Sequence, residues 1–323
     1  MSDEKLLILP DRRTLAYEHA GDLTSSIVVV FFPGTLSVGS AARLSPVLLS
    51  KGVHYISPTL PGYGNSSPAP KNVPYATTTA NDLTALLDNL YPSSRDNLEL
   101  YIGGGSLGTV PAQMIYGAPF SVFPWGKNIK GMLLLSPFPP FSEKGYRYAQ
   151  YMSYRNYLAI GPPARFVPFR LIQHLSKLYI SSQISTPARA EAFIQKFLFD
   201  TMEAEEREMY MRWREDHAYY DGELQKELAA MMRRSVEKSW EGFMSTADVL
   251  YASWGWKLGE LDEEHTAGRK VLVVSGKGDE TTPSEWAEYL TSKYPNASLK
   301  WIEGGHISGI FHMDEIWADF MGG

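Results

Sequence analysis

The chain has 323 residues, of which 44% are hydrophobic and 20% are charged, a mixture typical of globular proteins. This composition excludes disordered, collagen-like and coiled-coil proteins. Thirty basic residues against 36 acidic ones give a formal net charge of −6, so no overall positive charge is available to bind nucleic acid or anionic lipid. Because cysteine is absent, disulfides, thiolate metal sites and cysteine nucleophiles are excluded.

The amino-terminal residues carry acidic side chains, Asp3 and Glu4, where a signal peptide carries basic ones. No apolar stretch approaches the roughly 18 residues that a membrane-spanning helix needs. We therefore expect a cytoplasmic protein with no membrane partner.

Short apolar segments alternate with longer amphipathic segments along much of the chain. Residues 6–9 and 14–19 predict a β-hairpin, and the wholly apolar residues 27–32 predict a strand that is covered on both faces. Strands that alternate with helices indicate a mostly parallel sheet flanked by helices. The further predicted strands are 54–57, 98–102, 129–135, 271–275 and 298–302, and the predicted helices are 80–90, 107–116, 284–294 and 307–321.

The alternation stops at about residue 137 and resumes after about residue 263, and the stretch between is helical, aromatic and charged. We predict an α/β fold in which residues 1–136 and 264–323 form the core and residues 137–263 form a helical cap. The cap is expected to lie above the carboxyl edge of the sheet. Its aromatic residues are expected to be mostly core, with some facing a substrate, and its Glu- and Arg-rich run 203–216 is interpreted as a solvated helix face.

A G-x-S-x-G motif lies between a predicted strand and a predicted helix, with the sequence Gly104-Gly105-Ser106-Leu107-Gly108. Such a motif forms a tight turn that strains the serine backbone, and Gly104 and Gly108 let neighbouring backbone pass without a clash. The Ser106 hydroxyl is then presented at the start of a helix, where N–H groups favour developing negative charge. A serine is a poor nucleophile alone and needs a base and an orienting acid.

Asp279 and His306 are the predicted acid and base. Asp279 follows the strand 271–275, and His306 follows the strand 298–302 and precedes the last predicted helix. Because the carboxyl ends of parallel strands meet at one edge of a sheet, we expect these side chains to converge on Ser106. Glu280 is the alternative acid and His312 the alternative base.

The turn after the first buried strand is a candidate oxyanion site. Gly34, in the sequence Pro33-Gly34-Thr35, permits the chain to turn over the serine. The backbone N–H of Thr35 could then pair with that of Leu107 to hold an oxyanion.

Two other kinds of site are disfavoured. Residues 103–108 also match the dinucleotide pattern G-x-G-x-x-G, but no acidic residue occurs from Thr109 through Ser142 to hold a ribose. No histidine spacing indicates a metal. His54 is interpreted as a packed side chain, and the default role of the remaining histidines is solvated or capping: His19, His174, His217 and His265.

Taken together, these motifs resemble the α/β-hydrolase superfamily, in particular its lidded members. The resemblance covers nearly the whole chain and includes the residues Leu60-Pro61-Gly62-Tyr63-Gly64-Asn65-Ser66. It implies that Ser106 attacks, that His306 relays protons, that Asp279 orients the histidine, and that the inserted helices form a cap.

The function expected on this basis is that of a cofactor-free serine hydrolase, an esterase or lactonase acting on a small, fairly apolar substrate. The same triad serves C–C bond hydrolysis, acyl transfer and lyase chemistry in this superfamily. The alternative function, which belongs to a different class, is that of a hydrolase-fold protein that binds a ligand without catalysis. The sequence leaves the natural substrate and the oligomeric state open.

Overall fold

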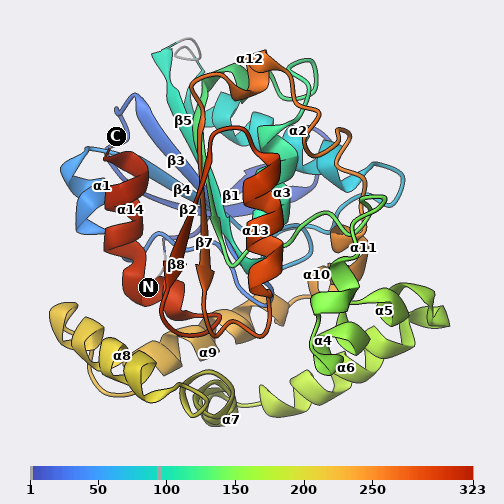
Figure 1. The fold of residues 1–323 in the computed structure, drawn as a ribbon, viewed down its shortest axis with the longest axis vertical. Helices are drawn as coiled ribbons and strands as arrows, with labels where there is room; N and C mark the ends of the chain where they lie inside the picture. The colour runs from blue at the N-terminus through green and yellow to red at the C-terminus, as the bar shows by residue number, and fades with distance from the viewer. Residues whose placement is uncertain (1–2, 93–96, 323) are drawn as a thin grey trace.

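The computed structural model describes residues 3–92 and 97–322, and at its centre is an eight-stranded sheet (Figure 1). The strand order is β1-β2-β4-β3-β5-β6-β7-β8; β2 pairs antiparallel with β1 and β4, and all other neighbours pair in parallel. The predicted mostly parallel sheet is thus confirmed. The strands are β1 (Lys5–Ile8), β2 (Thr14–Gly21), β3 (Ile27–Phe32), β4 (His54–Pro58), β5 (Glu99–Gly105), β6 (Ile129–Leu135), β7 (Lys270–Gly276) and β8 (Ala297–Ile302).

Helices cover both faces of this sheet. On one face lie α1 (Pro46–Ser50) and α14 (Met313–Met321), and on the other lie α2 (Tyr75–Leu90), α3 (Thr109–Tyr116) and α13 (Ser284–Lys293) (Figure 1). A parallel strand buried on both faces needs apolar side chains at every position. The unbroken apolar run of β3 meets that need.

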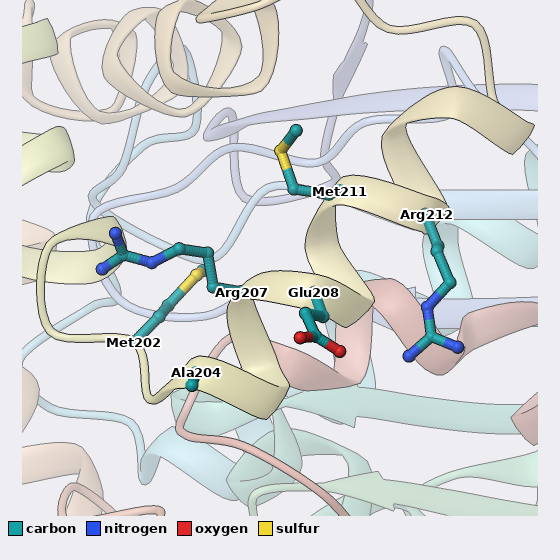
Figure 2. A pocket seen from close by; sticks show the side chains of 6 residues that line it. All are labelled: Met202, Ala204, Arg207, Glu208, Met211 and Arg212. Atoms are coloured by element: carbon teal, nitrogen blue, oxygen red, sulfur yellow. The ribbon is translucent and has the colours of Figure 1, made fainter.

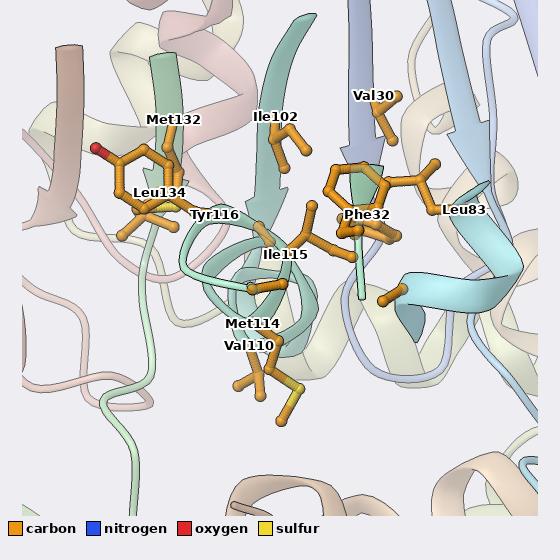
Figure 3. Close-up of a cluster of buried hydrophobic side chains, with 14 of the residues drawn as sticks. Val30, Phe32, Leu83, Ile102, Val110, Met114, Ile115, Tyr116, Met132 and Leu134 are labelled. Atoms are coloured by element: carbon orange, nitrogen blue, oxygen red, sulfur yellow. The ribbon is translucent and has the colours of Figure 1, made fainter. Parts of the chain in front are cut away.

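The larger core lies between the sheet and α3. Figure 3 shows Val30, Ile102 and Met132 of three neighbouring strands beside Val110 and Ile115 of α3. All five side chains are at most 1% exposed. Burial of this kind removes apolar area from water along the length of the helix, which fixes α3 and the turn that precedes it.

The chain between β6 and β7, all of which the structure describes, contains helices and turns only. Several of these helices form a layer at the lower end of the sheet in Figure 1 and enclose a separate apolar cluster that includes Ile194, Phe199 and Tyr210. The helices of this segment are α4 (Tyr154–Ala159), α5 (Pro162–Phe166), α6 (Leu171–Gln183), α7 (Pro187–Ile194), α8 (Ala204–Asp216), α9 (Glu223–Val236), α10 (Glu241–Met244), α11 (Thr246–Leu250) and α12 (Glu263–Thr266).

Two predicted helices have different bounds in the structure. Helix α2 begins at Tyr75, whereas the predicted helix began at residue 80. The prediction began too late because the first turns of α2 carry threonines instead of leucines at helical spacing. The predicted helix 307–321 is a 3-10 helix, Ser308–His312, followed by α14. Gly309 lowers helix propensity at that point, so His312 precedes α14 and does not lie inside it.

The histidines also differ in part from expectation. His54 is buried as predicted, with Nε2 2.9 Å from Nδ1 of His19 and Nδ1 bonded to the Tyr91 hydroxyl. His265, expected to have a solvated or capping role, is only 8% exposed and stacks on Phe120 at 4.2 Å, and its Nδ1 lies 2.6 Å from Oδ1 of Asp262, the residue that caps α12. The sequence around a single histidine does not reveal partners such as Tyr91 and Phe120, because these residues lie in distant segments of the chain.

The His54 environment predicts a pH dependence of stability. Burial and the neighbouring His19 lower the pKa of His54 from 6.5 to about 4, with Asp22 opposing. Below pH 6.5 the unfolded chain therefore binds a proton that the folded chain binds only near pH 4. The free energy of unfolding accordingly decreases as the pH is lowered from 6.5 to about 4.

Urea unfolding at a series of pH values measures this slope. We expect His54→Gln to flatten it, whereas the same change at the exposed His174 on α6 leaves it unaltered. An unchanged slope in the His54 variant would contradict the assignment.

Candidate active site

Ser106 lies in a turn that only glycine neighbours permit. A Cβ atom added at Gly104 would be 2.2 Å from the carbonyl oxygen of Gly108, and one added at Gly108 would be 2.1 Å from that of Phe32. Ser106 itself has a φ of 52°, in the left-handed region that costs a non-glycine residue free energy. Ser106 directly follows the end of β5 and begins the helical turn Ser106–Gly108.

The three residues predicted from the sequence lie in contact. Nε2 of His306 is 2.9 Å from Oγ of Ser106. Nδ1 of His306 is 2.8 Å from Oδ2 and 3.1 Å from Oδ1 of Asp279. These distances allow one hydrogen-bonded chain from hydroxyl to carboxylate, across side chains that follow β5, β7 and β8.

The Asp279 carboxylate is buried, at 7% exposure, and is held by three further donors. The backbone N–H groups of Thr281 and Thr282 donate to Oδ1, and the Thr282 hydroxyl donates to Oδ2 at 2.7 Å. Although burial raises the pKa of Asp279, the charge and hydrogen bond of His306 and the Thr282 donors lower it to about 2. The carboxylate is therefore ionised at neutral pH and fixed in orientation.

The predicted oxyanion turn passes directly beside the serine. A Cβ atom added at Gly34 would be 3.3 Å from Cβ and 3.8 Å from Oγ of Ser106. Thr35 follows Gly34, and Leu107 follows Ser106, so both predicted N–H donors belong to backbone next to the hydroxyl. Their role in holding an oxyanion stays a prediction.

Tyr63 supports this turn, a role that the sequence did not indicate. Its hydroxyl lies 3.3 Å from Oγ1 of Thr246 in α11. Burial raises the pKa of Tyr63 to about 12, and the nearby Thr246 side chain, Leu36 backbone and Thr35 side chain oppose this shift. Its ring packs against Gly242, where an added Cβ would be 2.5 Å away. Tyr63 thus connects the turn beside Ser106 to the helical segment.

Glu206 is a second residue that the sequence analysis missed. It belongs to the run expected to be solvated, yet it is 6% exposed and its Oε1 accepts hydrogen bonds from the Gly305 N–H, at 3.0 Å, and from the Ser308 hydroxyl. Gly304, with a φ of 94°, leaves room for this carboxylate. The helix α8 is therefore anchored to the loop that carries His306.

The opposite side of α8 is exposed and lines a hollow of about 660 Å³ (Figure 2). Arg207, Glu208 and Arg212 surround it together with Met202, Ala204 and Met211. The solvated interpretation of residues 203–216 holds for this side of the helix and is wrong for Glu206.

Asp279, and not the exposed Glu280, is the acid bonded to His306, and His312 has a different partner. The backbone oxygen of Glu280 accepts a hydrogen bond from Asn156, and Nδ1 of His312 lies 3.3 Å from Oε2 of Glu315. Among residues 3–92 and 97–322, no group of three or more His, Asp or Glu side chains could hold a metal ion. Nor does any helix in this described part have the length and apolar character to cross a membrane.

The model of the alpha/beta hydrolase family matches residues 29–319. The chain belongs to the alpha/beta hydrolase family. The comparison with curated protein sequences finds no match.

Solved structures show the same alpha/beta hydrolase fold at low sequence identity. A hydrolase from Pseudomonas aeruginosa is 16% identical, with a TM-score of 0.62 over 99% of both chains. An esterase from Exiguobacterium antarcticum is 16% identical, with a TM-score of 0.60 over 98% of both chains. A bromoperoxidase from Bacillus anthracis is 17% identical, with a TM-score of 0.64 over 99% of this chain and 100% of its own.

Replacement of either of two adjacent glycines before Ser106 by alanine should change the stability of the protein by different amounts. Gly104→Ala places a methyl group against backbone, so we expect a loss of about 3 kcal/mol in the free energy of unfolding. Gly105→Ala is the matched control, because its methyl group would meet only the Phe31 ring, at 3.8 Å. Urea unfolding monitored by tryptophan fluorescence compares them, and equal stabilities would refute this account of the turn.

The Glu206 contacts predict a second difference in stability. Glu206→Ala removes the acceptor of the Gly305 N–H and of the buried Ser308 hydroxyl, which costs about 1–3 kcal/mol. Glu206→Gln keeps an acceptor oxygen and should lose less. Glu208→Ala, on the exposed side of the same helix, serves as the control. A stability of Glu206→Ala equal to that of the control would show that the anchor contributes nothing.

Proposed function

We propose that this alpha/beta hydrolase is a serine hydrolase that cleaves a small, fairly apolar ester or lactone through an acyl-enzyme. The observation that carries the proposal is the continuous hydrogen-bonded chain from Ser106 through His306 to Asp279. Nucleophile, base and orienting acid within hydrogen-bond distance are what acyl transfer by a serine requires.

In the first half of the reaction, Oγ of Ser106 attacks the substrate carbonyl carbon while Nε2 of His306 takes the hydroxyl proton. Asp279 stays ionised and holds the Nδ1–H of the imidazole, which keeps Nε2 free to accept that proton. The tetrahedral oxyanion would be stabilised by the N–H groups of Thr35 and Leu107. His306 then gives its proton to the leaving alkoxide, and the acyl group stays on Ser106.

In the second half, His306 takes a proton from water, and the resulting nucleophile attacks the acyl carbonyl. Collapse of the second tetrahedral intermediate returns the proton to Oγ of Ser106 and releases the carboxylic acid. With a lactone, the alcohol and the acid leave as one hydroxy acid. No cofactor takes part in this sequence.

Apolar surroundings support a fairly apolar substrate. Leu36 and Ile307 directly follow the proposed oxyanion turn and the proposed base, and both pack against the apolar cluster of the helical segment. We propose that residues 137–263 act as the cap of the site, joined to the reacting loops through Glu206 and Tyr63. The relative from Exiguobacterium antarcticum is described as an esterase.

Hydrolysis of p-nitrophenyl esters of increasing acyl length, beside a set of lactones, tests the proposal. We expect Ser106→Ala and His306→Ala each to lower kcat/KM by about 10⁴-fold or more, because the residues act as a unit. Asp279→Asn should lower it by about 10⁴-fold, since the amide favours the wrong imidazole tautomer.

His312→Ala is the control, because this histidine is bonded to Glu315 outside the proposed triad. Its kcat/KM should stay within a few-fold of the wild type. Folded wild-type protein with no turnover of any ester or lactone would favour a scaffold that only binds its ligand, and full activity of Ser106→Ala would refute the mechanism.

A further inference from the structure

The helices α4, α5 and α6 expose an unusual amount of apolar side chain. In the part of the chain that the structure describes, ten of the eighteen exposed large hydrophobic residues lie between residues 154 and 197. Monomeric proteins seldom expose large apolar patches unless a partner covers them. Nine of the ten belong to α4, α5, α6 or the turn Pro168–Arg170, and the tenth, Phe197, follows α7 (Pro187–Ile194). The ten residues are Tyr154, Tyr157, Leu158, Phe166, Phe169, Leu171, Leu175, Leu178, Tyr179 and Phe197.

Helix α6 has its apolar side turned to solvent. Leu171, Leu175 and Leu178 follow one another at spacings of four and three residues, which places them on one side of the helix, and they are 53%, 58% and 68% exposed. The buried residue of the same helix is the polar Gln173, whose Nε2 donates to the Ala164 carbonyl oxygen. A helix that served only the core would show the reverse pattern.

The turn between α5 and α6 carries Phe169, the most exposed of these apolar residues, next to Phe166 at the end of α5. Phe166 is 76% exposed and Phe169 is 93% exposed. Phe169 and Arg170 both have left-handed backbone, with φ of 57° and 51°, a conformation that costs free energy for such residues. Two phenylalanine rings are thus held out in solvent beside Arg165 and Arg170.

The charge around these side chains is opposite to that of the whole protein. Residues 144–196 contain eight Lys and Arg residues and one acidic residue, Glu191, in a chain with an excess of acidic residues overall. Seven of the basic side chains are exposed, and Lys177 is half-buried. The eight are Lys144, Arg147, Arg155, Arg165, Arg170, Lys177, Arg189 and Lys196.

Neighbouring elements leave most of this positive charge available. Asp248 of α11 pairs with Arg170, at 2.5 Å. Arg155 lies over the Phe197 ring, at 4.5 Å from its centroid, and Arg165 lies over the Tyr251 ring, at 5.2 Å. Cation–π contacts of this kind hold a guanidinium among aromatic rings without removing its charge.

We propose that this surface, which we call the α4–α6 face and define by the ten exposed apolar residues above, binds the surface of an anionic phospholipid bilayer. Apolar side chains would enter the boundary between headgroups and acyl chains, and the Lys and Arg residues would contact the anionic headgroups. Because no helix in the described residues is suited to cross a membrane, the binding is peripheral. The average charge of −6 concealed this surface from the sequence analysis.

The charge also argues against a second copy of the chain as the occupant. A symmetric dimer built on the α4–α6 face would bring two sets of basic side chains together, and like charges repel across an interface. A lipid surface offers both the apolar interior and the opposite charge. The inference goes beyond the proposed hydrolysis and does not depend on it.

Flotation with vesicles tests the proposal on the full-length protein. We expect binding to vesicles of phosphatidylcholine mixed with phosphatidylglycerol, with at least tenfold weaker binding to phosphatidylcholine alone and a marked loss at high salt. The double variant Leu175→Glu, Leu178→Glu should bind at least tenfold more weakly than the wild type. Turnover of a soluble p-nitrophenyl ester should be unchanged, which distinguishes this result from failure of the proposed function.

A matched control is the double variant Leu23→Glu, Leu49→Glu, whose leucines are 59% and 56% exposed outside the helical segment. It should bind vesicles as the wild type does. Absence of wild-type binding, or equal binding by both double variants, would overturn the proposal. A dimer in analytical ultracentrifugation that Leu175→Glu, Leu178→Glu dissociates, without vesicle binding, would assign the face to a second copy instead.

Discussion

The hydrogen bond between Ser106 and His306 joins residues that are 200 positions apart in the chain, and the rest of the site depends on it. It exists because β5, β7 and β8 run parallel and end at the same edge of the sheet. The helices on the two faces bury the strands, the strands fix the loops, and the loops bring a hydroxyl and an imidazole to 2.9 Å. Rigid support of this kind is what holds a reactive geometry against thermal motion.

The parts of this arrangement that follow from local pattern could be predicted from the sequence. The apolar run of β3 identified a doubly covered strand, and the glycines around Ser106 identified the strained turn. Asp279 and His306 were recognisable because each follows a predicted strand. The boundaries of α2 and of the last helix were less predictable, since threonines and Gly309 weaken the apolar period without preventing a helix.

Residues whose role depends on packing between distant segments could not be predicted. Glu206 lies in a charged run like those of any solvated helix, and only the position of α8 against the His306 loop buries its carboxylate. Tyr63 belongs to a loop motif, but its contacts with Leu36 and Thr246 require the helical segment to be in place. The basic stretch 144–196 is contiguous in the sequence, so the whole-chain charge of −6 hid it only by averaging. The exposure of its apolar side chains, in contrast, becomes visible only in the fold.

Covalent labelling with a fluorophosphonate, followed by peptide mapping, tests the central claim most directly, because the reagent reacts only with a serine that a neighbouring base activates. We predict a single modified residue, Ser106, in the folded wild-type protein, and no modification when His306 is replaced by alanine. An unmodified Ser106 in the wild type, or labelling that persists without the imidazole, would show that the contact between these two side chains does not create a nucleophile.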